Sequence, residues 1–80
     1  MEPLTEALRL LQRQAELEAR MRNPGGICVN EERELFRLQA YLAQIPAATR
    51  AVLEASTCLH RPVDTLSINE IERIADLRAR

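Results

Sequence analysis

The stretch from Asn30 to Leu59, NEERELFRLQAYLAQIPAATRAVLEASTCL, decides the fold. Its larger apolar residues recur at steps of three, four and three, as Leu35, Leu38, Leu42 and Ile45. Because an α-helix completes a turn every ~3.6 residues, these side chains form one narrow stripe. The stretch therefore predicts an amphipathic helix, and the segments before and after it are expected to cover that stripe.

The composition predicts one small all-α domain that spans residues 1–80. A chain of 80 residues is too short for a second domain, and a core of this size supplies roughly 3–5 kcal/mol of net stability. Phe36 and Tyr41 are the only aromatic residues. The other apolar residues are mainly Leu, Ile and Ala, which suit closely packed helices.

A first helix is expected from Leu4 or Thr5 to Arg22, with two overlapping apolar stripes. Because the combined face is wide, this helix should contact more than one neighbour. The sequence Asn-Pro-Gly-Gly at 23–26 ends it. A second helix should begin with Asn30 as its N-cap, so that the two helices form an antiparallel hairpin.

Pro46 interrupts the second helix, and a break there is favoured over a kink because proline removes a backbone donor. A third helix is expected over 47–58. Ser67 and Glu70 have the spacing of a capping box, which places a fourth helix at 68–79. The predicted fold is thus a small helical bundle, an antiparallel helical hairpin plus two shorter helices.

The charge pattern disfavours nucleic-acid binding. The eleven basic residues, all arginine, are interspersed with twelve acidic residues, and the net charge is -1. A non-specific nucleic-acid binder usually has a basic excess or stripe. The sequence has no apolar stretch of the ~20 residues that a membrane span needs, and its N-terminus lacks the pattern of a signal peptide. A cytoplasmic protein with reduced cysteines is therefore expected.

Two kinds of chemical site are weakly indicated. Cys28, Cys58 and His60 are the only soft metal ligands, but the paired Cys-x-x-Cys spacing of structural zinc sites is missing. A nucleophile beside His60 would have only Asp64 as an orienting carboxylate. The sequence therefore predicts no enzyme, no cofactor and no small-molecule substrate, and it leaves a metal site as an alternative.

A DNA-binding transcription regulator is a second alternative, with the fourth helix as the reading element. That helix carries Arg73, Arg78 and Arg80. The gap before it, from about Leu59 to Leu66, is longer than the turn of three or four residues in helix-turn-helix motifs.

The leading hypothesis is a non-enzymatic protein–protein interaction module, acting as a regulator, adaptor or small chaperone. The predicted helices carry more apolar residues than the core of so small a bundle needs. Surplus apolar surface usually contacts a partner protein or a second copy of the chain. A homodimer is therefore expected. Methionine and aromatic residues are enriched at interface cores. The residues predicted to contact a partner are Leu10, Leu17, Met21, Phe36 and Tyr41.

Residues 4–45, rich in Leu, Gln, Arg and Glu, resemble in composition the small helical-hairpin co-chaperones of type III secretion. The resemblance covers about half of the chain and carries no specific motif. It implies the same kind of role, in which a helical face supports another protein.

Overall fold

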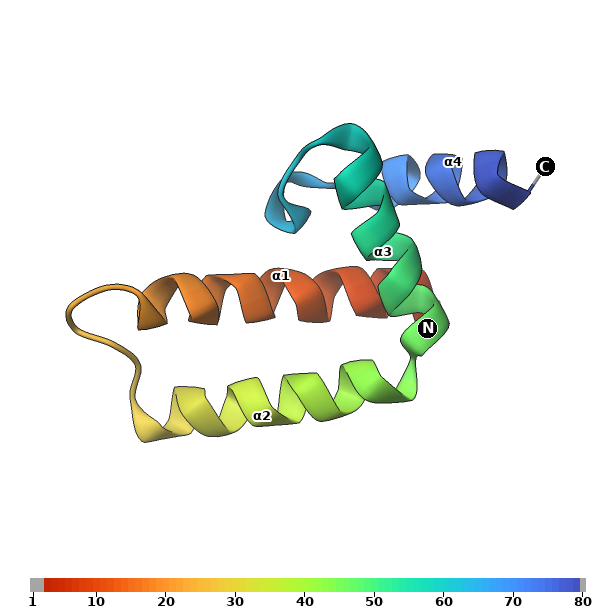
Figure 1. Ribbon diagram of the computed structural model, residues 1–80. Coiled ribbons are helices and arrows are strands. Elements are labelled where there is room, and N and C mark those ends of the chain that lie inside the picture. The colour runs from red at the N-terminus through yellow and green to blue at the C-terminus, as the bar shows by residue number, and fades with distance from the viewer. Residues whose placement is uncertain (1–2, 80) are drawn as a thin grey trace.

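The computed structural model describes residues 3–79, which form four α-helices and one short 3-10 helix. The helices are α1 (Pro3–Met21), α2 (Val29–Gln44), α3 (Pro46–Leu59) and α4 (Ile68–Ala79), and the 3-10 helix η1 spans Val63–Thr65. Helices α1 and α2 form the antiparallel hairpin, and α3 crosses the hairpin at its end away from the loop (Figure 1). The all-α prediction is confirmed.

Like α3, helix α1 contacts all the other helical elements, which for α1 are α2, α3, η1 and α4. One side of it presents Ala7, Leu8 and Leu11 to the main core, which α3, α4 and the segment before α4 complete. Another side presents Leu17 to Leu35 and Leu38 of α2. The wide apolar face predicted for this helix therefore has two sets of neighbours. The segment 30–59, expected to be central, contains most of α2 and all of α3. Most of its contacts come through α3, which contacts α1, α2, η1 and α4, whereas α2 contacts α1 and α3. This segment therefore shares the central position with α1.

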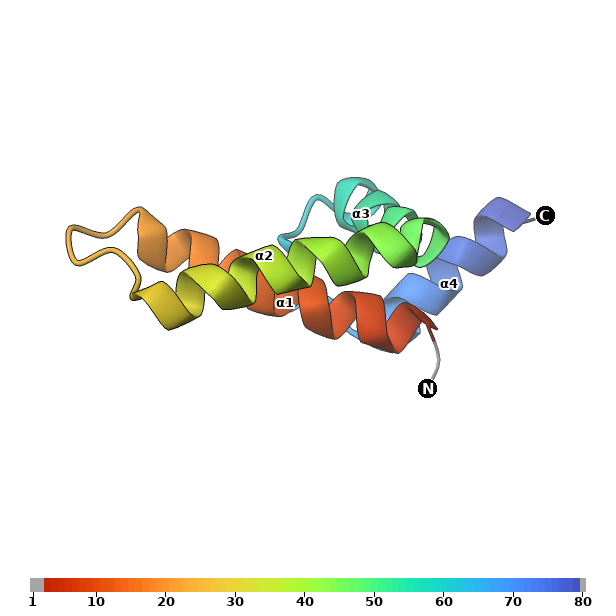
Figure 2. The same ribbon diagram turned by 90° about the horizontal axis from the view of Figure 1, so that it is seen from below.

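The structure is elongated, with principal extents of 45 × 25 × 15 Å. Its radius of gyration is 13.4 Å, whereas a compact chain of this length has about 11.6 Å. Figure 2 shows why: the loop half of the α1–α2 hairpin projects beyond α3 and α4. We call this projecting half the arm.

A break at Pro46 separates α2 from α3, as the sequence predicted. Proline has no N–H to donate to the carbonyl of Leu42, four residues earlier. That carbonyl instead accepts from the N–H of Ile45 at 3.2 Å and from Oγ1 of Thr49 at 3.3 Å. Helix α3 starts at Pro46 itself, one residue earlier than predicted. This is the helix position at which proline is best tolerated.

The capping box of α4 is confirmed. Oγ of Ser67 accepts from the N–H of Glu70 at 3.3 Å, and the Ser67 N–H donates to Oε1 of Glu70 at 3.1 Å. Leu66 and Ile71 are both buried in the main core, as expected for a hydrophobic staple. Arg61 also pairs with Glu70, so the connection from α3 is tied to the start of α4.

The start of α2 differs from the prediction. Cys28 is the N-cap and Asn30 lies inside the helix. The N–H of Cys28 donates to Oε1 of Glu31 at 3.3 Å, which gives a carboxylate at the third helical position the role expected in a capping box. Ile27 is half-buried, while Cys28 and Val29 are exposed. Gly26 has φ +63°, a conformation that favours glycine, at the end of the loop turn.

We predict that Leu17→Ala lowers the free energy of unfolding by about 2–5 kcal/mol, the usual cost of removing a fully buried leucine. Leu17 is one of three residues that form the core of the arm. Leu77→Ala is a matched control, since Leu77 is 59% exposed. This substitution should change the free energy of unfolding by no more than about 0.5 kcal/mol. Urea unfolding followed by circular dichroism compares the two variants. Equal losses would show that the arm is not packed as described.

Candidate protein-interaction surface

An ion-pair network closes one edge of the seam between α1 and α2. Arg13 binds Glu34 in bidentate fashion, at 2.6 Å from Nε and 3.0 Å from Nη2. Glu16 bridges Arg13 and Arg20, at 3.1 Å and 3.4 Å. Arg20 also pairs with Glu31. We call this side the ion-pair edge.

The pKa values of this network follow from its contacts. The hydrogen bond from Arg13 lowers the pKa of Glu34, and the same contact raises the pKa of Arg13. The backbone N–H of Cys28 and then the guanidinium of Arg20 lower the pKa of Glu31. These carboxylates therefore favour the folded state in their charged form.

The other edge of the same seam has no such closure among the described residues, and we call it the open edge. On helices that turn by about 100° per residue, Glu18 and Met21 of α1 lie on the side of Leu17 away from Arg13 and Arg20. Phe36 and Glu32 of α2 lie on the side of Leu35 away from Glu34. Because the ion pairs fix how the two helices face each other, these residues share one side of the arm.

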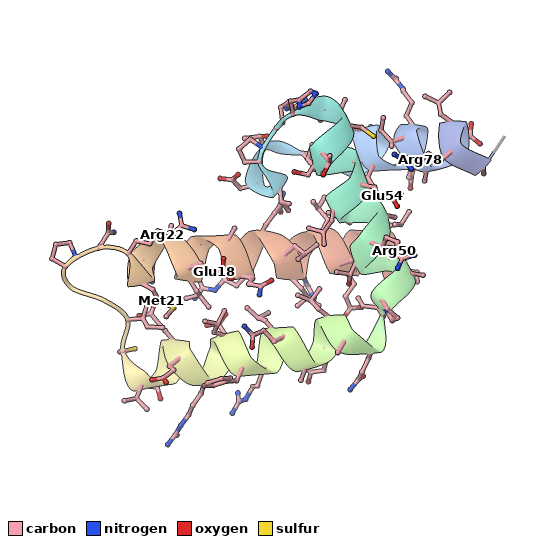
Figure 3. All side chains as sticks on the ribbon, in the orientation of Figure 1. Glu18, Met21, Arg22, Arg50, Glu54 and Arg78 are labelled. Atoms are coloured by element: carbon pink, nitrogen blue, oxygen red, sulfur yellow. The ribbon has the colours of Figure 1, made fainter. Side chains whose placement is uncertain are left out.

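Exposed apolar residues gather on the open edge. Phe36 is 63% exposed and Met21 is 51% exposed. In Figure 3, Met21 lies at the side of α1 that faces α2, near Glu18. Within residues 3–79, neither Glu18 nor Glu32 forms an ion pair. The open edge is therefore an apolar surface with acidic side chains beside it.

The open edge continues into a groove of about 560 Å³ between α2 and α3. Its α2 wall is made by Gln39, Leu42 and Ala43. Of these, Gln39 and Ala43 follow Phe36 along the same side of the helix, and Leu42 belongs to the buried stripe. Its α3 wall includes Leu53, which is 46% exposed. We call this hollow the α2–α3 groove.

Three charged residues lie at the rim of the α2–α3 groove (Figure 3). Arg78 of α4 pairs with Glu54 at 3.6 Å and donates to Sγ of Cys58 at 3.4 Å. The pKa of Arg78 is raised, first by Cys58 and then by Glu54. Arg50 has no ion-pair partner among residues 3–79, so the rim carries an uncompensated positive charge.

The five residues predicted to contact a partner do not share one surface. Leu17 is completely buried, and Leu10 is half-buried between the two cores. Leu17 therefore has no accessible surface to offer a partner, and Leu10 could offer only part of its surface. Tyr41 is 55% exposed but lies about 140° around α2 from Phe36, toward the ion-pair edge. Met21 and Phe36 remain together on the open edge.

Leu53 and Arg50 of the groove are not among the residues predicted from the sequence to contact a partner. Leu53 is one of several apolar residues in the third helix, and only Ala48, Val52 and Ala55 of these are buried. Ala48, Val52 and Ala55 form one buried stripe on α3, and Leu53 lies outside that stripe. Its position outside the stripe is the sequence signal that could have identified it as a surface residue.

The residues considered for metal or nucleophilic chemistry have structural roles. Among residues 3–79, no group of three Cys, His, Asp or Glu residues could hold a metal ion. His60 ends α3 in a left-handed conformation with φ 53°. The hydroxyls of Ser56 and Thr57 donate to backbone carbonyls, at 2.6 Å to Arg61 and 3.1 Å to Leu53. Both cysteines are free and exposed.

The elements considered for DNA recognition are separated as the sequence predicted. The connection between α3 and α4 runs from His60 to Ser67 and contains η1. Arg73 is exposed, Arg78 is engaged with Glu54, and Arg80 lies outside the described residues. A search of residues 3–79 for a helix long and apolar enough to cross a bilayer finds none.

We predict that the protein loses stability as the pH falls through the range below about 4.5, the ordinary pKa of a glutamate. A carboxylate whose pKa is lowered in the folded state stabilises it above the unfolded-state pKa, and this contribution disappears on acidification. Glu34→Gln should therefore flatten the decline of the free energy of unfolding between pH 5 and pH 2. Urea titrations at several pH values measure the free energy of unfolding, and Glu72→Gln, at an exposed glutamate, is the control. An unchanged slope in Glu34→Gln would contradict the role of the Arg13–Glu34 pair.

Comparison with known proteins identifies no family for the chain. No protein-family model matches the sequence, and neither a characterised protein nor a solved structure matches it. The function proposed next therefore depends on the surface described above: its apolar residues, its shape and its charges.

Proposed function

We propose that the protein is a non-enzymatic interaction module that presents an apolar helical surface to another protein and associates with itself. The single observation that carries this proposal is the open edge, where Phe36 and Met21 are each more than half exposed beside the apolar α2–α3 groove. An exposed apolar patch with polar residues around it is typical of a protein-interaction site.

The shape of the molecule supports the proposal. The accessible surface is 5659 Å², whereas a compact monomer of this mass has about 4,900 Å². The excess is close to the ~800 Å² that each partner contributes to a standard interface. The arm is the source of this excess, because only α1 and α2 pack there.

The contact would be formed by helix faces. Phe36, Ala40 and Ala43 are spaced along one exposed side of α2, and Met21 faces the same side from α1. A partner helix that lies along this side would cover the arm in the way that α3 covers the other half of the hairpin. Regulators, adaptors and small chaperones act through such helix-on-helix contacts.

We predict a molar mass near twice 9.1 kDa in a light-scattering dilution series, with Phe36→Ala raising the dissociation constant at least tenfold, about 1.4 kcal/mol. Because Phe36 is exposed in the monomer, its removal should change the free energy of unfolding of the dilute protein by less than about 0.5 kcal/mol. Unfolding of the isolated monomer by Phe36→Ala would instead make Phe36 a core residue and refute its assignment.

A further inference from the structure

We propose that the protein forms a closed twofold dimer in which Phe36 of each copy enters the α2–α3 groove of the other. The inference builds on the self-association proposed above and specifies its surface. It starts from one observation: the projecting aromatic side chain and the apolar groove lie on the same side of α2, separated along the helix.

This arrangement makes the surface self-complementary. In a twofold interface, a residue that contacts a second residue is contacted by that second residue in return. If Phe36 meets the partner's Ala43, then Ala43 meets the partner's Phe36, and the axis passes between Gln39 and Ala40. Ala40 and Ala43 are small and exposed, so two antiparallel α2 helices can approach closely at the axis.

The groove fits an aromatic occupant. It is open and mainly apolar, and its 560 Å³ exceeds the size of one phenylalanine side chain. Leu53 forms part of its wall and is 46% exposed, so an inserted ring would cover apolar surface that the monomer leaves in water. Burial of a large aromatic side chain is a dominant contribution in protein interfaces.

Unpaired charges on the two halves of the surface complement each other. Glu32 lies one turn before Phe36, and Arg50 lies at the rim of the groove. Neither forms an ion pair within residues 3–79. When Phe36 enters the partner's groove with the two α2 helices antiparallel, Glu32 lies toward the start of the partner's α3, the helix that carries Arg50. A second copy of this chain therefore matches the surface in shape and in charge.

Tyr41 provides a matched control for Phe36. It is an aromatic residue on the same helix with a similar exposed fraction, 55% against 63%, but it faces away from the groove. Phe36→Ala should raise the dimer dissociation constant at least tenfold, and Tyr41→Ala should leave it within about twofold. Sedimentation equilibrium across a dilution series measures both.

Charge reversal then tests the register. Glu32→Arg and Arg50→Glu should each raise the dissociation constant by about fivefold or more, since each places like charges together across the interface. The double variant should return it to within about twofold of the original protein. This rescue excludes a general effect on α2, because Arg50→Glu cannot restore the acidic residue that Glu32→Arg removes from the first turn.

The outcomes separate the two proposals. A wild-type protein that stays monomeric at every concentration overturns both the self-association and this dimer. A dimer that is weakened equally by Phe36→Ala and Tyr41→Ala, or whose charge reversals show no rescue, overturns this arrangement and leaves self-association standing. The arrangement is supported if Phe36→Ala weakens the dimer, Tyr41→Ala does not, and the double charge variant restores the dissociation constant of the original protein.

Discussion

The packing of other elements around α1 is the constraint on which the structure depends. The helix presents one apolar side to α2 and another to α3, α4 and η1, so it organises both clusters of buried residues. A second, polar contact supports the same arrangement: Nε2 of Gln12 donates to the carbonyls of Val63 and Leu66, each at 3.4 Å. The segment between α3 and α4 is thereby held against α1. Without α1, the elements α2, η1 and α4 would keep only their contacts with α3.

The lengths of the helices and the break at Pro46 explain the arm. Helices α3 and α4 are shorter than α1 and cover only the half of the hairpin away from the loop (Figures 1 and 2). The break at Pro46 sets this geometry, because it turns α3 across the hairpin instead of extending α2 along it. In the rest of the hairpin, α1 and α2 pack only on each other. The apolar face of each helix is therefore covered by one helix there, and no third helix within residues 3–79 covers the pair. The same turn creates the α2–α3 groove, so one local constraint produces both the exposed arm and the hollow beside it.

The charges distinguish the two edges of the arm. On one edge, two arginines and three glutamates join α1 to α2, and their contacts with water are partly replaced by contacts with each other. Such exposed pairs contribute little stability individually, although a network with a bidentate member is better placed to fix geometry. On the open edge, Glu18 and Glu32 have no such partners in the part of the chain that the structure describes, and the apolar residues lie between them. Under the proposed function, this asymmetry places the contact on one edge of the arm and gives Phe36 and Tyr41, close in sequence, different expected roles.

Local signals in the sequence determined the helices of this protein. The spacing of Leu35, Leu38 and Leu42, the capping box at Ser67 and the break at Pro46 all act within one or two helical turns, and each appears in the structure as predicted. The N-cap of α2 was the exception. The backbone N–H of Cys28 donates to the carboxylate of Glu31, so Cys28 caps the helix and the helix begins before Asn30. Only the tertiary structure decided which apolar residues are core and which are surface. Leu17 and Phe36 look equally suited to an interface in the sequence, yet one is fully buried and the other is 63% exposed. Leu17 is buried because α2 folds back onto α1 and brings Leu35 and Leu38 against it, and Phe36 stays exposed because the ion pairs turn it to the other side of the seam. Both outcomes are set by contacts between residues far apart in the chain.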